Sequence, residues 1–166
     1  MSSDFSGDKN TFVSRGQDYY PHIYPRFSWT HLKKLAPTTQ VTPRAGGQFY
    51  WNKIRSAVDS QAGSLFVGMF DECDEGTAIA PMSDDPPNSP SGWGQFVTNE
   101  GKPSHWWMML TGEAHDILTR ARPNGQPLPG VDQLLRKYGS SCCGTLTSNT
   151  SLTRNARLTS SYDAQK

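Results

Sequence analysis

The sequence predicts an α/β fold, and three observations carry this prediction. Apolar residues recur at helical spacing between Phe49 and Ala62, and Gly63 follows as a stop signal. A short apolar run rich in strand-forming residues, Ser64 to Phe70, comes directly after this helix. A second helical pattern begins beyond a long loop. A helix followed by a buried strand is half of a βα repeat, the unit of parallel sheets and barrels.

The size and charge of the chain restrict its class. It has 166 residues, with 16 basic and 15 acidic side chains, which predicts one domain or a piece of a larger one. This near-neutral balance lacks the excess of positive charge that binding to a nucleic acid or an anionic membrane needs, so we expect neither as a partner. No apolar run approaches the ~20 residues of a membrane span. The first residues lack a signal peptide, so we expect a cytoplasmic protein if Met1 is the true start.

The three cysteines predict neither a disulfide framework nor a metal site. Cys142 and Cys143 are adjacent in a Ser/Gly-rich stretch, and Cys73 stands alone among carboxylates. Those acidic neighbours would raise the pKa of the Cys73 thiol, which disfavours a nucleophilic role. We therefore expect no metal and no cofactor.

The elements follow in order along the chain. Residues 1–17 are polar and without periodicity, so they predict a disordered arm. Residues 18–29 are aromatic-rich and contain Pro21 and Pro25, which predicts a short strand with irregular ends. Residues 34–47 form a connection rich in Pro and Gly, and the first helix and the apolar strand come next.

The second half of the chain contains a long loop and another helix. Residues 81–103 are rich in Pro, Gly, Ser and Asn, and long loops of this kind are often functional. The next helix is expected over 104–121, with Ser104 as its N-cap. Its apolar stripe consists of Trp107, Leu110, Ala114, Ile117, Leu118 and Ala121. The composition of residues 139–166 predicts a disordered tail, which leaves 18–138 as the folded part.

Four carboxylates lie within five residues at the end of the predicted strand, Asp71, Glu72, Asp74 and Glu75. If residues 64–72 run extended, this strand is apolar on both faces until its last two positions, as expected for a strand buried on both sides. The carboxylates then follow its C-terminal end, where the active sites of parallel α/β folds and barrels gather. This position makes them candidates for chemistry.

The spacing of Glu72 and Glu75 suits a pair of carboxylates with divided roles. Fully extended, their Cα atoms would be ~10 Å apart, and a turn through Cys73 and Asp74 would bring them within about 7 Å. Gly76 can release the chain from such a turn at low steric cost. At this distance one carboxylate can act as base or nucleophile and the other as acid in glycoside hydrolysis.

Two other interpretations of the acidic residues remain beside this one. They can be surface acids that solvate a loop or cap a nearby helix. They can also be compared with a calcium loop, in which Asp71 would take position one and Gly76 position six. Cys73 at position three and Met82 at position twelve do not fit that pattern.

The segment MFDECDEGTAI resembles the F-[DN]-E-x-x-E-G-T-x-I signature of glycoside hydrolase families 71 and 99, which include endo-α-mannosidases and xylosidase/arabinosidase-like proteins. The flanking segments YPRFSW, PRAGGQFYWNKI and WWMMLTGEAHDIL are similar to segments of those families in order and spacing. The resemblance covers about 18–129. It implies a (β/α)₈ barrel, of which this chain would be the C-terminal and incomplete part, because a complete barrel needs ~250 residues.

The resemblance also implies roles for particular residues and a carbohydrate as substrate. Glu72 would be the base that assists attack by the sugar's own 2-hydroxyl, and Glu75 the acid that protonates the leaving oxygen. Asp71 would stand beside the reacting sugar. Trp29, Arg44 and Trp51 are candidates for lining the site, with packed aromatic rings and a structural arginine as the alternative.

Three functions are therefore open from the sequence. The chain can be the catalytic C-terminal part of a glycosidase. It can be an inactive carbohydrate-binding module that uses a surface of Trp29, Trp51, Trp93, Trp106 and Trp107. It can also be a truncated product without function, whose missing strands would leave sheet edges and apolar surface exposed.

Overall fold

The computed structural model describes residues 5–36, 41–85 and 91–139. Its elements, in chain order, are α1 (Phe5–Val13), β1 (His22–Ile23), β2 (Phe27–Ser28), β3 (Val41–Thr42), η1 (Ala45–Gly47), α2 (Gln48–Asp59), β4 (Phe66–Val67), α3 (Trp106–Leu118) and α4 (Val131–Tyr138). None of the helices in these ranges is long and apolar enough to cross a membrane.

The centre of the fold is a βαβ unit. Strands β1 and β4 pair in parallel, with His22 opposite Phe66 and Ile23 opposite Val67. The N–H of Phe66 donates to the carbonyl of Pro21 and the N–H of Gly68 to that of Ile23, which extends the ladder by one bond at each end. Helix α2 connects the two strands and contacts β1. The predicted succession of helix and strand is therefore confirmed.

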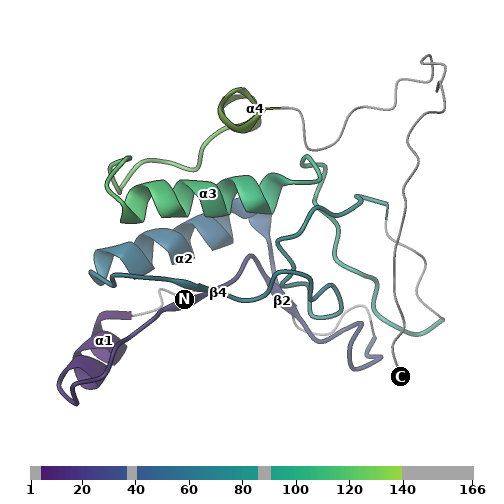
Figure 1. Cartoon of the computed structure of the whole chain (residues 1–166). Helices are drawn as coiled ribbons and strands as arrows, with labels where there is room; N and C mark the ends of the chain where they lie inside the picture. The colour runs from purple at the N-terminus through teal and green to yellow at the C-terminus, as the bar shows by residue number, and fades with distance from the viewer. Residues whose placement is uncertain (1–4, 37–40, 86–90, 140–166) are drawn as a thin grey trace, which may run out of the picture.

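Helices α2 and α3 lie side by side, and α4 packs on α3 on the side away from the strands (Figure 1). Each helix turns an apolar face inward because its apolar residues recur at three and four positions. The core between them is fully or almost fully buried and consists of Phe5, Ile23, Tyr50, Trp51, Ile54, Ala57, Ile79, Trp106, Trp107, Met109, Leu110, Ala114, Ile117 and Leu134.

The described residues contain a second pair of strands. Strands β2 and β3 are antiparallel, with Phe27 opposite Thr42 and Ser28 opposite Val41. The chain continues from β3 through Pro43 and Arg44 into η1 and then into α2. This arrangement places Arg44 and the start of α2 beside the strand that carries Ser28.

The predicted strand over 64–72 is shorter and more exposed than expected. Only Phe66 and Val67 form β4, and Phe66 and Phe70 are 53% and 57% exposed. The expectation of burial on both faces was wrong for this strand. Among the described residues, helices cover one face of the β1–β4 pair, so the side chains of the opposite face meet solvent (Figure 1).

Other boundaries also differ from the prediction. The expected disordered arm over 1–17 contains helix α1, because Phe5 is buried in the core and its ring lies under the Lys53 ammonium. Ser104 is not the N-cap of α3, since a turn closed by the Trp106 N–H and the Pro103 carbonyl precedes the helix. Helix α4 was not predicted, and residues 140–166 of the expected tail lie outside the described residues.

Candidate functional site: the acidic loop

The acidic loop, Phe70 to Ala80, is a compact hairpin held by backbone hydrogen bonds. The N–H groups of Ile79 and Ala80 donate to the carbonyl of Phe70 at 3.0 and 2.8 Å. Closer to the tip, the N–H groups of Thr77 and Ala78 both donate to the Glu72 carbonyl at 3.2 Å. Residues 76–79, which return from the tip of the loop, are buried, whereas Asp71, Glu72 and Asp74 before them are exposed. The backbone that carries the carboxylates is therefore fixed by its hydrogen bonds to the buried residues that follow it.

A turn at the tip of the loop runs from Cys73 to Gly76, one residue later than the turn through Cys73 and Asp74 that the spacing suggested. The N–H of Gly76 donates to the Cys73 carbonyl at 3.0 Å, and Gly76 adopts a positive φ of 68°. This conformation favours glycine over any residue with a side chain. A Cβ at Gly76 would also lie 2.6 Å from Cγ2 of Val97, so the turn is pressed against the long loop.

The four carboxylates differ in exposure and contacts. Asp71, Glu72 and Asp74 are exposed, and Glu75 is half-buried. The Ser28 N–H donates to the carbonyl of Glu75 at 2.7 Å, which ties this residue to β2. In the described part of the chain, the carboxylates of Glu72 and Glu75 have no hydrogen-bond or ion-pair partner. Both are therefore open to a ligand.

His31 is a neighbour of the acidic loop that the sequence did not single out. Its Nδ1 lies 3.0 Å from Oδ1 of Asp74. The two atoms do not meet hydrogen-bond geometry, so the contact becomes an ionic one when the imidazole is protonated.

Arg44 supports the loop from behind and does not line an open site. Its side chain is 0% exposed, and Nη2 donates to the Gly76 carbonyl at 3.2 Å. The guanidinium lies 4.3 Å from the ring centroid of Trp107 in α3. Burial and the neighbouring Arg26 lower the pKa of Arg44 to about 10, against a smaller opposing effect of Glu100 and Cys73. Arg44 is therefore a structural arginine, the alternative to a residue that lines the site.

A buried chain of contacts links Arg44 to the long loop. Nε1 of Trp107 donates to Oδ1 of Asn99 at 2.9 Å, and Nδ2 of Asn99 donates to the Met82 carbonyl at 2.8 Å. The Asn99 N–H in turn donates to Oδ1 of Asp84 at 2.7 Å. The described ends of the 81–103 loop are thus bonded to the helix that supports the acidic loop.

The other predicted lining residues are placed in opposite environments. Trp29 follows β2 and is 41% exposed, close to the Ser28–Glu75 contact. Trp51 is fully buried in the first turns of α2, where Nε1 donates to the Gln126 carbonyl at 3.0 Å and Arg122 lies over its ring. Trp51 is therefore a packed aromatic residue and has no surface to offer a ligand.

Cys73 is poorly suited to nucleophilic chemistry. Burial raises the pKa of its thiol, and Asp74 and Asp71 raise it further, while Arg44 acts in the opposite direction. The predicted direction is the same, but the leading cause is desolvation and not the acidic neighbours. In the described ranges no group of three or more His, Cys, Asp or Glu residues could hold a metal ion.

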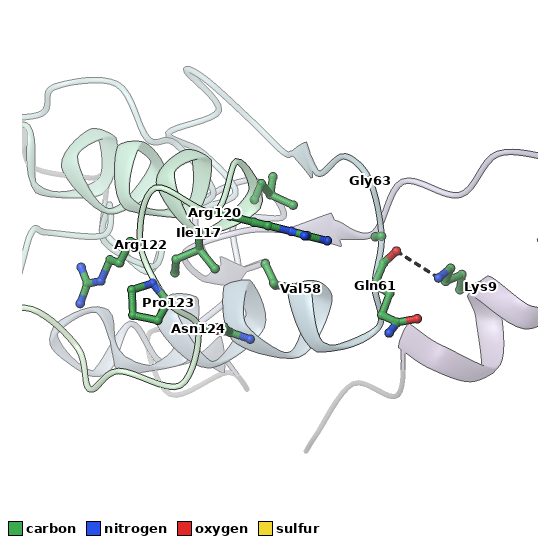
Figure 2. Close-up of a pocket in the computed structure, with 11 residues that line it drawn as sticks. Lys9, Val58, Gln61, Gly63, Ile117, Arg120, Arg122, Pro123 and Asn124 are labelled. Carbon is green, nitrogen blue, oxygen red and sulfur yellow. Dashed lines mark hydrogen bonds between the residues drawn. The ribbon is translucent and has the colours of Figure 1, made fainter.

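A cavity of about 780 Å³ lies elsewhere, where α2 and α3 end and α1 approaches them. Figure 2 shows Arg120, Ile117 and Pro123 on one side and Gln61 and Lys9 on the other. Lys9 Nζ donates to the Gln61 carbonyl at 3.0 Å, and Arg122 is paired with Glu113. These two cations already have structural partners, and none of the predicted site residues lines this cavity.

The fold was compared with known proteins. No protein-family model matches this sequence, and no curated protein matches it. Two solved structures of a GH99 endo-α-mannosidase from Bacteroides thetaiotaomicron are similar in fold, one of them in complex with Bis-Tris propane. Each is 17% identical over 74% of this chain, with TM-scores of 0.61 and 0.60. The match spans 37% and 34% of those chains, so this chain corresponds in fold to about a third of that enzyme.

Proposed function

We propose that this chain is the part of a glycoside hydrolase that carries the catalytic acid–base pair, with Glu72 as base and Glu75 as acid. Residues 18–138 would form the C-terminal portion of a (β/α)₈ barrel, and the substrate would be a carbohydrate. The observation that carries this proposal is the acidic loop, which follows a parallel strand of a βαβ unit and holds two unpaired carboxylates three residues apart.

The mechanism would use the difference between the two positions. Glu72 lies before the turn of the acidic loop and is exposed, so it would reach a hydroxyl on a bound sugar. Glu75 is half-buried, and its backbone carbonyl accepts from the Ser28 N–H of β2, so it would take the role of acid at a fixed position. The exposed Asp71 would contact the sugar, and Arg44 would keep the hairpin in place through the Gly76 carbonyl.

The fold similarity supports the proposal at a coarser level. The similar structures belong to an endo-α-mannosidase, which acts on carbohydrate, and the active sites of barrels lie at the C-terminal ends of their strands. The chain spans about a third of that enzyme, so the remaining sugar-binding surface would come from residues outside this sequence.

The experiment measures hydrolysis of α-mannan, xylan and arabinan by the longest protein that contains this sequence. We expect Glu75→Gln to reduce the rate by about 10²–10⁴-fold, the usual contribution of a general acid. Asp85→Asn, which changes an exposed carboxylate of the long loop, is the matched control and should leave the rate unchanged.

A second substrate separates the two roles. An aryl glycoside with an acidic phenol as leaving group needs no proton, so it should restore the rate of Glu75→Gln but not that of Glu72→Gln. Full activity of Glu75→Gln on the natural polysaccharide would remove Glu75 from the mechanism.

A further inference from the structure

The structure divides the five tryptophans of the chain into two groups. Trp51, Trp106 and Trp107 are buried in the core and cannot touch a ligand. Trp29 is 41% exposed and Trp93 is half-buried, and each is linked to the acidic loop through one neighbour, Ser28 and His31 respectively. A sugar-binding surface made of all five rings is therefore excluded, whereas one made of these two rings is open.

Trp29 is held close to Glu75 by the strand before it. The Ser28 N–H donates to the Glu75 carbonyl at 2.7 Å, so Trp29 is one residue from a direct contact with the predicted acid. Its ring meets the ring of Phe27 edge to face at a centroid distance of 4.6 Å. Phe27 thus supports the indole, and the ring remains 41% exposed.

Trp93 comes from the long loop, and its ring contacts that of His31. The edge of His31 faces the Trp93 ring at 5.7 Å, and Phe96 stacks on the imidazole at 3.6 Å. The same His31 has its Nδ1 3.0 Å from Oδ1 of Asp74 on the acidic loop. One imidazole therefore contacts both the aromatic residues and a carboxylate.

The approach of these two segments depends on Gly94. A Cβ at this position would lie 2.1 Å from Cβ of Thr30 and 2.8 Å from its backbone carbonyl carbon. No side chain fits there without a shift of the loop that carries Trp93. The close packing of Gly94 on Thr30 fixes Trp93 relative to Trp29, which lies one residue before Thr30.

Cations and carboxylates surround the two rings. The ammonium of Lys33 lies 5.1 Å from the ring centroid of Trp29, and that of Lys34 lies 4.7 Å from that of Trp93. Indole faces pack against the C–H face of a pyranose, and carboxylate and ammonium groups bond to its hydroxyls. This combination suits a neutral polyhydroxylated ring better than an anion, because the Asp74 carboxylate lies beside His31, which contacts Trp93.

We propose that Trp29 and Trp93 form an aromatic platform on which a sugar ring of the substrate stacks beside the acidic loop. The proposal rests on the proposed function and assigns a binding subsite to that site. Trp93 belongs to it together with Trp29, and Gly94 and His31 position Trp93 without touching the sugar.

The test measures binding to the full 166-residue chain that carries Glu75→Gln, so that hydrolysis does not consume the ligand. α-Manno-oligosaccharides, xylo-oligosaccharides and arabino-oligosaccharides are titrated separately by calorimetry and by tryptophan fluorescence. We expect saturable binding of one of these classes. Trp29→Ala and Trp93→Ala should each weaken it about tenfold, the scale of one aromatic contact.

Three further variants separate the platform from a general loss of structure. Trp93→Phe keeps an aromatic face and should bind within about threefold of the parent. Gly94→Ala keeps both rings but displaces one, and it should weaken binding as Trp93→Ala does. Met108→Ala removes an exposed apolar side chain on α3 and serves as the matched control, with unchanged binding.

The outcomes distinguish this proposal from the proposed function. Absence of saturable binding to all three classes overturns the platform, and so does equal binding by Trp29→Ala, Trp93→Ala and Met108→Ala. Binding that depends on both rings without any hydrolysis by the wild-type protein would remove the glycosidase activity and retain the platform. Hydrolysis with an unchanged KM in both alanine variants would retain the glycosidase activity and remove the platform.

Discussion

Arg44 shows how a single buried residue can organise the site. It donates to the carbonyl of Gly76, stacks on Trp107 and acts on Cys73 through its charge. Among the described residues, Nε and Nη1 are buried without a hydrogen-bond partner, so Nη2 supplies the hydrogen bond that joins the guanidinium to the loop. Its role in the structure is to position the acidic loop. Its positive charge acts on Cys73, which is exposed on that loop.

Cys73 offers a direct measurement of this charge. In a Cys142→Ser/Cys143→Ser background, the pH at which half of Cys73 reacts with a thiol reagent reports the thiol pKa. We expect Arg44→Met to move this midpoint to higher pH, because a charge that lowers the pKa of Cys73 is lost. Arg44→Lys, which retains a charge, should move it less.

The same variants should differ in stability. Arg44→Met leaves the buried Gly76 carbonyl without its donor, which costs about 1–3 kcal/mol. Arg55→Met, on α2, is the control in both measurements. If neither the thiol midpoint nor the denaturation midpoint of Arg44→Met changes, the arginine does not position the loop.

At the level of elements, α4 is attached to α3 through one buried carboxylate. Glu113 is 1% exposed and accepts from Lys137 Nζ at 2.5 Å and from Tyr138 Oη at 3.0 Å, and it is also paired with Arg122. Lys137 contacts Asp116 on the next turn of α3 as well. Apolar contacts add to these polar ones, since Leu134 of α4 is fully buried in the core and Val131 and Leu135 pack against it.

The contact between Lys137 and Asp116 should make the docking of α4 depend on pH. The hydrogen bond from Lys137 lowers the pKa of Asp116, more than its partial burial raises it. A carboxyl whose folded pKa is lowered stabilises the fold above its unfolded pKa of about 3.9. This contribution is lost as the pH falls through the lower, folded value.

The prediction is checked by comparing wild type with Asp116→Asn in urea between neutral and strongly acidic pH. We expect the wild type to be more stable at neutral pH, and the difference to shrink below about pH 4. Asp132→Asn, an exposed change on α4, should follow the wild type throughout. A difference that stays constant on acidification would mean that the ionic contact does not hold α4.

On the scale of the whole molecule, the described sheet is open. Strand β1 pairs with β4, and neither has a second neighbour within the described residues. Phe66, Met69 and Phe70 are exposed on and after β4. A parallel strand with a free edge and uncovered apolar side chains is a template for pairing with another chain. This chain corresponds in fold to about a third of a larger enzyme.

We expect the 166-residue chain alone to bind a hydrophobic dye and to associate as its concentration rises, measured by light scattering. Phe70→Ser and Phe66→Ser should reduce both effects because they remove uncovered apolar surface at β4. Val13→Ser, at an exposed apolar position on α1, should have little effect. A wild-type chain that stays monomeric and dye-free would show that this surface is covered in solution.

Local features of the site followed from the sequence by itself. The helical spacing of Ile54 and Ala57 and the strand-forming run after Gly63 gave the βα succession, since both depend on neighbours along the chain. The turn at Cys73 to Gly76 was predictable to within one residue, because glycine accommodates a positive φ at low cost. The roles of Glu72 and Glu75 stay a prediction until they are tested.

The tertiary structure alone decided which side chains face solvent and which distant segments meet. Sequence offers no reason why Trp51 should be buried and Trp29 exposed, or why Trp93 should come to His31 across some sixty residues. Burial is a property of what packs against a side chain, and the contacts of Arg44 with Gly76 and of Glu113 with Lys137 join residues 32 and 24 positions apart. Local pattern determined the elements, and long-range packing determined the site.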